Sequence, residues 1–191
     1  VLELSKGGAM AAQAPQVDLG FAAPAFSLPA TDGKSYGLAD LKGDKGTVVA
    51  FICNHCPYVV GMIDRLVGDA RELAGLGVNT VAICSNDAMS YPEDAFPNMQ
   101  AFALAHDFPF PYLHDESQEV ARAYGAVCTP DLFGFDADLK LAYRGRLDAG
   151  RTEPPPPGAK RELLDAMTFV SKTGKAPAEQ AASVGCSIKW K

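Results

Sequence analysis

The sequence lacks any long apolar run. The longest one, Val48 to Cys53, is far shorter than the roughly 20 residues that a membrane-spanning helix needs. A basic cluster is also missing, because 17 Lys and Arg residues stand against 23 Asp and Glu residues, for a net charge of −6. Nucleic acids and anionic membranes are bound through concentrated positive charge, so we expect neither as a partner.

The N-terminal residues 1–20 lack an apolar segment of the signal-peptide kind and any regular hydrophobic period. We therefore expect a flexible tail over 1–20 and a cytoplasmic protein, although the chain begins at Val1 and its natural start can lie further upstream. The rest of the sequence predicts one domain over 21–174 and a C-terminal tail over 175–191.

The disulfide framework of a small secreted protein is not indicated either, because the five cysteines are odd in number. In a reducing compartment, cysteines close together are more often redox-active or metal-binding than structural. Cys53 and Cys56, in the stretch CNHCP, form such a pair. The spacing alone leaves a redox pair, half of a zinc site and coincidence open.

Hydrophobic periodicity gives the coarse order of elements. It predicts strands over 47–52, 78–84 and within 108–115, helices over 58–76, part of 92–106, 117–125 and 159–172, and hairpins over 23–41 and 132–145. Strands that alternate with helices predict parallel pairing, and the late hairpin adds antiparallel strands. The expected fold is an α/β three-layer sandwich, a central mixed sheet flanked by helices, with an N-terminal β-hairpin extension.

The cysteine pair lies between a predicted buried strand and a predicted helix. We expect Cys53 at the helix N-terminus, where free backbone N–H groups and the helix dipole stabilise a thiolate. Cys56, one turn further on, is expected to lie close to Cys53 and to be more buried. Pro57 fits the first turn of a helix, because no hydrogen bond is lost there.

Strand, CxxCP and helix in this order resemble the thioredoxin-like superfamily. The similarity extends over about residues 22–172 and is to the peroxiredoxin-like and membrane-anchored thioredoxin-like branch of this superfamily, of the AhpC/TSA type. It is carried by the segments VNTVAICSND and YGAVCTPDLFGFDADLKLAYRG. The resemblance implies that Pro130 is a cis-proline facing the cysteines and that Thr129 offers backbone hydrogen bonds to a substrate. We place Asn54 with these two residues in the expected substrate-binding set.

The resemblance implies thiol–disulfide exchange without a cofactor. Cys53 attacks a substrate disulfide, and Cys56 then resolves the mixed disulfide. The expected partners are protein or small-molecule thiols and disulfides, with an external reductant such as a thioredoxin or glutathione system. The strand TVVAFI carries no acid, unlike thioredoxin, so another carboxylate or water must handle protons.

His55 stands between the two cysteines. A histidine before the second cysteine resembles the strongly oxidising periplasmic enzymes, and its imidazole can donate a hydrogen bond or positive charge to sulfur. We expect His55 to lower the pKa of Cys53 below about 6 and to make the protein less reducing than thioredoxin. The alternative is a histidine that merely faces solvent at a helix start.

Two other functions stay open. A peroxiredoxin-like thiol peroxidase would use Cys53 as its peroxidatic cysteine, but the motif P-x-x-x-T-x-x-C is missing, since Ala50 and Gly46 stand at its Thr and Pro positions. A metal-binding thioredoxin-fold module would need more ligands, because a structural zinc site usually takes four and no second CxxC exists. We expect no metal.

The remaining cysteines are Cys84, Cys128 and Cys186. Cys84 and Cys128 are best interpreted as buried packing residues. Cys186 stands in the C-terminal GCSIKWK, and proteins with the CNHCP motif often end in a similar way. Our hypothesis is that this segment folds back near the CxxC motif and that Cys186 is an auxiliary redox residue.

Overall fold

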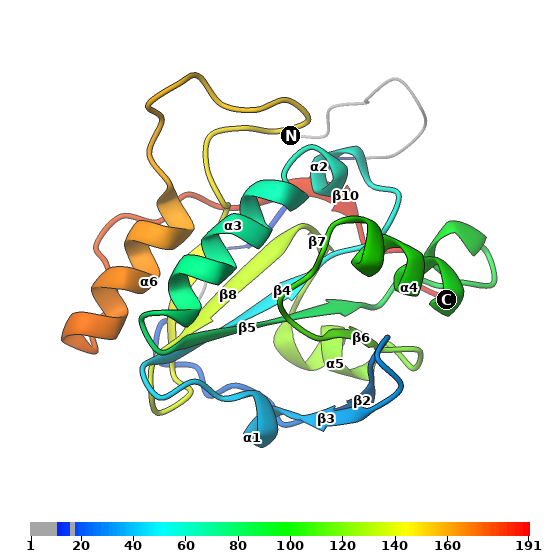
Figure 1. Ribbon diagram of the computed structural model, residues 1–191, viewed down its shortest axis with the longest axis horizontal. Helices are drawn as coiled ribbons and strands as arrows, with labels where there is room; N and C mark the ends of the chain where they lie inside the picture. The colour runs from blue at the N-terminus through cyan, green and yellow to red at the C-terminus, as the bar shows by residue number, and fades with distance from the viewer. Residues whose placement is uncertain (1–10, 16–17) are drawn as a thin grey trace.

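The computed structural model describes residues 11–15 and 18–191, with a central sheet between layers of helices (Figure 1). The sheet has five strands in the order β6-β5-β4-β8-β9. Their bounds are β4 (Gly46–Phe51), β5 (Val78–Cys84), β6 (Tyr112–His114), β8 (Asp131–Phe135) and β9 (Leu141–Gly145). Strands β4, β5 and β6 run parallel, whereas β4–β8 and β8–β9 are antiparallel pairs. The predicted mixed sheet is confirmed.

Strand β4 lies at the centre of the sheet and is buried along its whole length. Val48 and Ala50 belong to the core on one face of the sheet, and Val49 and Phe51 to the core on the other. Successive side chains of a strand point to opposite faces, so a strand covered on both sides needs an apolar residue at nearly every position. This explains the continuous apolar run in the sequence.

Helices and a hairpin cover the two faces of this sheet. One face carries α2 (Pro57–Val60), α3 (Ile63–Ala74), α4 (Phe96–Ala105) and α6 (Glu162–Thr173). The other carries α1 (Leu38–Leu41), α5 (Glu119–Tyr124) and the hairpin of β2 (Ser27–Pro29) and β3 (Ser35–Gly37). The three-layer sandwich and its N-terminal hairpin are confirmed. None of the helices in the described ranges is long and apolar enough to cross a membrane.

The helix predicted over 58–76 is divided into α2 and α3, with Gly61 and Met62 between them. A Cβ atom at Gly61 would overlap the backbone of Thr152, which comes from the proline-rich loop after β9. The glycine therefore lets this loop pack directly against the end of α2. The loop thus closes over the side of the molecule that holds the cysteine motif.

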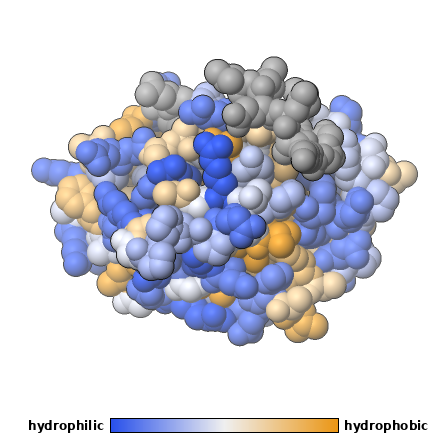
Figure 2. Space-filling model, turned by 90° about the horizontal axis from the view of Figure 1, so that it is seen from above, coloured by the Kyte–Doolittle hydropathy of each residue, from blue (hydrophilic) through white to orange (hydrophobic). Residues whose placement is uncertain are grey.

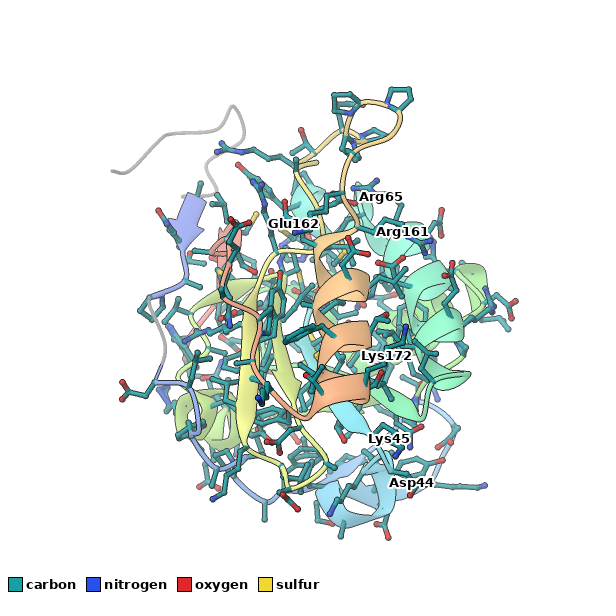
Figure 3. All side chains as sticks on the ribbon, turned by 90° about the vertical axis from the view of Figure 1, so that its left-hand side faces the viewer. Asp44, Lys45, Arg65, Arg161, Glu162 and Lys172 are labelled. Carbon is teal, nitrogen blue, oxygen red and sulfur yellow. The ribbon has the colours of Figure 1, made fainter. Side chains whose placement is uncertain are left out.

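Arginine–carboxylate pairs tie α3 to the segments before α6. Arg65 donates from Nε to Oδ2 of Asp148 over 2.7 Å, and Arg161 donates from Nε to Oδ1 of Asp69 over 3.0 Å. Figure 3 shows Arg65 and Arg161 close together near the first turn of α6. Asp69 and Asp148 are buried, so these are not ordinary surface ion pairs. They hold the segments before α6 against α3.

Both expected tails contain strands, which corrects the predicted boundaries. The strands β1 (Ala11–Gln13), β7 (Cys128–Thr129) and β10 (Val184–Ser187) form a second sheet in the order β1-β10-β7. Strands of two to four residues carry too few positions to show a period, so hydrophobic periodicity does not predict them. Residues 1–10, also assigned to the N-terminal tail, lie outside the described residues.

Candidate active site

Cys53 follows the end of β4, and Cys56 is the residue that caps the N-terminus of α2. Both side chains are buried. The helix starts at Pro57, so the expectation that Cys53 itself occupies the helix N-terminus is wrong by one turn. The backbone N–H groups of Val59 and Val60 donate to the carbonyl of Cys56 over 2.9 Å each. The favourable end of the helix dipole therefore acts on Cys56.

Thr129 lies against the cysteine pair, and the peptide bond between Thr129 and Pro130 is cis, as the resemblance implied. The hydroxyl oxygen of Thr129 is 3.5 Å from Sγ of Cys53. Sγ of Cys56 lies 3.3 Å from the backbone carbonyl oxygen of Thr129. Thr129 thus contacts both sulfurs, although it is far from them in the sequence.

The two thiols share their protons, and the geometry favours the thiolate on Cys56. Hydrogen bonds from the side chains of Cys186 and Cys53, with backbone N–H groups of Cys186 and Val59, lower the pKa of Cys56 to about 2. The same hydrogen bond to Cys56, together with burial, raises the pKa of Cys53 well above its ordinary value. In such a pair the first proton lost belongs to both sulfurs. The predicted low pKa of Cys53 is therefore wrong for this arrangement.

His55 does not act on the sulfurs in the expected way, because its partner is a carboxylate. Its Nδ1 lies 2.8 Å from Oδ2 of Asp94, as a close ion pair without an aligned hydrogen bond. Contact with Asp94 raises the pKa of His55. The ring also stacks on Tyr91, with ring centroids 6.1 Å apart. His55 is about a third exposed, so it is neither buried nor simply a solvent-facing residue.

Asp94 is a residue of this site that the sequence did not reveal. It ends η1 (Pro92–Asp94), in the segment between β5 and α4, and its side chain is fully buried. Besides His55, it accepts hydrogen bonds from the backbone N–H of Asn54 and from Nδ2 of Asn86, each over 2.8 Å. The only sequence signal was an acid in a segment that follows the strand next to β4. It provides the carboxylate that the strand before the motif lacks.

Asn54 uses both ends of its side-chain amide within the protein. Its Nδ2 donates to the carbonyl of Glu93 over 3.1 Å, and its Oδ1 accepts from the hydroxyl of Tyr112 over 2.8 Å. These contacts fix the CNHCP turn to the η1 segment and to β6. A direct contact of the Asn54 side chain with substrate stays a prediction. The contacts that the structure shows for this side chain hold the loop in place.

Three side chains at this place could hold a metal ion. Cys53, His55 and Asp94 each offer a ligand atom, and these atoms all lie within 4.8 Å of one another. A thiolate, an imidazole and a carboxylate suit a zinc-like ion in a site with an open position. It is the one such group found in residues 11–15 and 18–191. A metal here would occupy the sulfur of Cys53, so metal binding and disulfide exchange would compete.

Cys186 reaches the site from the C-terminal segment, as hypothesised. It lies on β10, opposite Thr129 on β7, and is 5% exposed. A Cβ atom at the preceding Gly185 would overlap the carbonyl of Thr129, so the close approach of the two strands requires glycine at that position. Figure 1 shows β10 next to both α2 and β7. The site therefore contains three cysteines, the two of the CxxC motif and Cys186.

The other two cysteines are packing residues in this structure. Both are buried, and burial raises the pKa of Cys84 to about 12 and raises that of Cys128 further. The thiol of Cys128 donates to the carbonyl of Pro130 over 3.6 Å and so points away from the CxxC pair. Figure 2 shows the face of the molecule on which α2 lies. This face is mostly hydrophilic, with separate hydrophobic patches.

Comparisons with known proteins identify the family of this chain. The AhpC/TSA family profile matches residues 19–144. A Mycobacterium tuberculosis protein with the provisional name peroxiredoxin is 29% identical over 112 residues, which are 59% of this chain and 66% of its own length. A thiol-disulfide oxidoreductase, ResA, of Bacillus cereus is 27% identical over 129 residues, or 66% of this chain and 68% of that protein. The matched part thus spans about two thirds of these relatives.

Two solved structures resemble the whole chain. An uncharacterized conserved protein of Geobacillus kaustophilus is 46% identical, with a TM-score of 0.90, over 95% of this chain and 96% of its own. A hypothetical protein of Sinorhizobium meliloti is 41% identical, with a TM-score of 0.86, over 94% and 98%. A thioredoxin domain from Bacteroides vulgatus, 17% identical with a TM-score of 0.58 over 71% and 91%, shares the fold. The chain has a thioredoxin-like fold and belongs to the AhpC/TSA family.

Proposed function

We propose that this protein is a thiol–disulfide oxidoreductase in which Cys53 and Cys56 cycle between dithiol and disulfide. The observation that carries the proposal is the placement of two buried sulfurs against Thr129, with Sγ of Cys53 3.5 Å from its hydroxyl and Sγ of Cys56 3.3 Å from its carbonyl oxygen. A pair of thiols that already holds one thiolate is prepared for exchange, because the thiolate is the nucleophile. Relatives named peroxiredoxin and thiol-disulfide oxidoreductase support redox activity at the level of the family.

Cys53 is the attacking residue in this proposal. The sulfur of Cys56 is enclosed by the Thr129 carbonyl, by Cys186 and by the first turn of α2. When a substrate disulfide approaches, the proton of Cys53 moves along the existing hydrogen bond to Cys56. The Cys53 thiolate then forms a bond to one substrate sulfur, and the other substrate sulfur leaves as a thiolate.

Cys56 completes the exchange. Cys56 gives its proton to the substrate thiolate that left first. Its own thiolate then attacks Sγ of Cys53, the Cys53–substrate bond breaks, and the second substrate sulfur leaves as a thiolate that takes a proton from solvent. The substrate gains two electrons and the enzyme ends as the Cys53–Cys56 disulfide, which an external dithiol or glutathione reduces again. The same steps run backwards oxidise a dithiol, and the direction follows the potentials of the two couples.

His55 and Asp94 supply and accept protons in this scheme. Contact with Asp94 raises the pKa of His55, which favours the imidazolium, and an imidazolium can protonate a leaving thiolate. Asp94 keeps the ring oriented and lies within 4.8 Å of the Cys53 sulfur. Thr129 and Pro130 border the attacking sulfur and form the wall against which a small disulfide rests.

A Cys56→Ser variant tests the proposal. Without the resolving thiol, oxidised glutathione leaves one glutathionyl group on Cys53, found by mass spectrometry of the intact protein and its peptides. The double variant Cys53→Ser/Cys56→Ser is the matched control and gains no group at this site. A Cys56→Ser protein that stays unmodified at Cys53, while wild type also forms no Cys53–Cys56 disulfide, contradicts the proposal.

Peroxide reduction is the second candidate, and the names of the relatives favour it. The Cys53 thiolate would attack a peroxide to give a sulfenic acid and an alcohol or water, and Cys56 would then condense with it to form the disulfide and water. Positions Ala50 and Gly46 in β4 lack the Thr and Pro of the peroxidase motif. Hydrogen peroxide consumption that persists in Cys56→Ser with an external thiol would favour this second function.

A further inference from the structure

The C-terminal strand β10 occupies the backbone edge at which the resemblance placed a substrate. The N–H of Ile188 donates to the carbonyl of Val127 over 3.0 Å. In an antiparallel ladder, facing pairs alternate between hydrogen-bonded and non-bonded kinds. Two residues along, Cys186 and Thr129 therefore form the next hydrogen-bonded pair. The backbone groups of Thr129 are engaged with β10, so an incoming strand cannot use them unless β10 leaves.

This strand also brings a thiol to the sulfur of Cys56. Cys186 pairs with Thr129 across the ladder, and the carbonyl oxygen of the same Thr129 lies 3.3 Å from Sγ of Cys56, which places Cys186 beside Cys56. The Cys186 thiol is buried, and no disulfide joins it to another cysteine. Cys56 therefore has two thiol neighbours, Cys53 on its own loop and Cys186 on the strand that covers the docking edge.

We propose that Cys186 is a third redox cysteine, which exchanges with the Cys53–Cys56 disulfide to give a Cys56–Cys186 disulfide and a free Cys53. This inference rests on the proposed function, because it needs the first disulfide to form. β10 then acts as a built-in substrate strand, and the exchange moves the disulfide from the CxxC motif to the link between the motif and β10.

The exchange balances without an added oxidant. Cys186 loses its proton to solvent and its thiolate attacks Sγ of Cys56, so a Cys186–Cys56 bond forms while the Cys53–Cys56 bond breaks. Cys53 leaves as a thiolate and takes a proton from solvent, which balances the proton that Cys186 released. One disulfide and one thiol are present before and after the step, so no electrons enter or leave the protein.

The buried disulfide also provides a link to movement of β10. Cys186 and Cys56 joined by a covalent bond would hold β10 on β7, whereas reduction of that bond would leave only the short ladder to hold the strand. Access of a protein strand to Thr129 is therefore expected only when Cys186 is reduced.

Peptide mapping of the wild-type protein tests the inference. The protein is equilibrated in glutathione redox buffers of increasing oxidising strength, quenched in acid, alkylated and digested. We expect two linked peptides, Cys53–Cys56 and Cys56–Cys186. Cys53→Ser removes the competing bond, so Cys56–Cys186 becomes the main disulfide. The matched control Cys53→Ser/Cys128→Ser keeps that disulfide, because Cys128 points elsewhere.

The outcomes separate the two proposals. A wild-type protein that forms Cys53–Cys56 but never Cys56–Cys186, with Cys186 alkylated throughout and also in Cys53→Ser, overturns the role of Cys186 and leaves the proposed function intact. Cys186→Ser should still form Cys53–Cys56. A wild-type protein that forms neither disulfide at any buffer composition overturns both.

Discussion

Nδ1 of His55 lies 2.8 Å from a carboxylate oxygen of Asp94, which is fully buried at the end of η1. The motif histidine is thus paired with an acid from a separate segment, and the same acid binds the backbone N–H of Asn54 within the motif. A buried carboxylate with several donors orients each of them, because leaving any of them unpaired is costly. The CNHCP loop therefore depends on residue 94.

Asp94→Asn is expected to lower the pKa of His55 toward its ordinary value, because the contact that raises it is lost. The measurement is an NMR titration of the His55 ring resonances. Asp64→Asn is the matched control, since Asp64 contacts His106 instead, and it should leave the His55 titration unchanged. An unaltered His55 midpoint in Asp94→Asn would show that the pair does not set the charge of this ring.

The same contact gives a sign to the pH dependence of stability. The folded-state pKa of His55 is raised, so its contribution is fully present below the unfolded-state pKa of about 6.5 and is lost as pH rises through the folded-state pKa. The difference in unfolding free energy between wild type and His55→Gln should shrink across that window. Urea unfolding at a series of pH values measures it, and a gap that widens with rising pH would contradict the pairing.

The reduced protein should carry one thiolate at a pH where ordinary thiols are protonated. Hydrogen bonds, first from Cys186 and then from Cys53, lower the pKa of Cys56 to about 2. Absorbance at about 240 nm should report this thiolate below the ordinary thiol pKa of about 8.5. Cys56→Ser should lose the signal and Cys186→Ser should shift its midpoint upward, while Cys128→Ser should leave it in place. A first thiolate that appears only near the ordinary pKa would refute the shared-proton arrangement.

The frame of this fold was readable from the sequence, whereas the site was readable only in part. The run Val48 to Cys53 predicts a strand buried on both faces, and Cys53 with Cys56 was found from spacing at a strand–helix junction. Thr129 and Pro130 came from resemblance. Asp94 and the contacts of Cys186 have no local period or motif, because they depend on how separate segments meet. The partner of His55 was therefore predicted wrongly.

Gly185→Ala tests whether β10 must approach β7 as closely as the structure shows. A Cβ atom there would overlap the carbonyl of Thr129, so the strand has to shift and carry Cys186 away from Cys56. Overpacking of this kind costs about 1–3 kcal/mol of unfolding free energy, and the pKa of the first thiol should rise because Cys186 no longer donates to Cys56.

Gly68→Ala is the matched control for that substitution. Gly68 lies within α3, and a Cβ atom there meets nothing within 4 Å. Alanine in a helix interior is favoured over glycine by about 0.5–1 kcal/mol, so this variant should be slightly more stable and should keep the wild-type thiol titration. Urea unfolding and thiolate absorbance are measured on both variants. If Gly185→Ala matched Gly68→Ala in both readouts, then β10 would not need its close contact with Thr129, and Cys56 would draw its low pKa from the helix start and Cys53 alone.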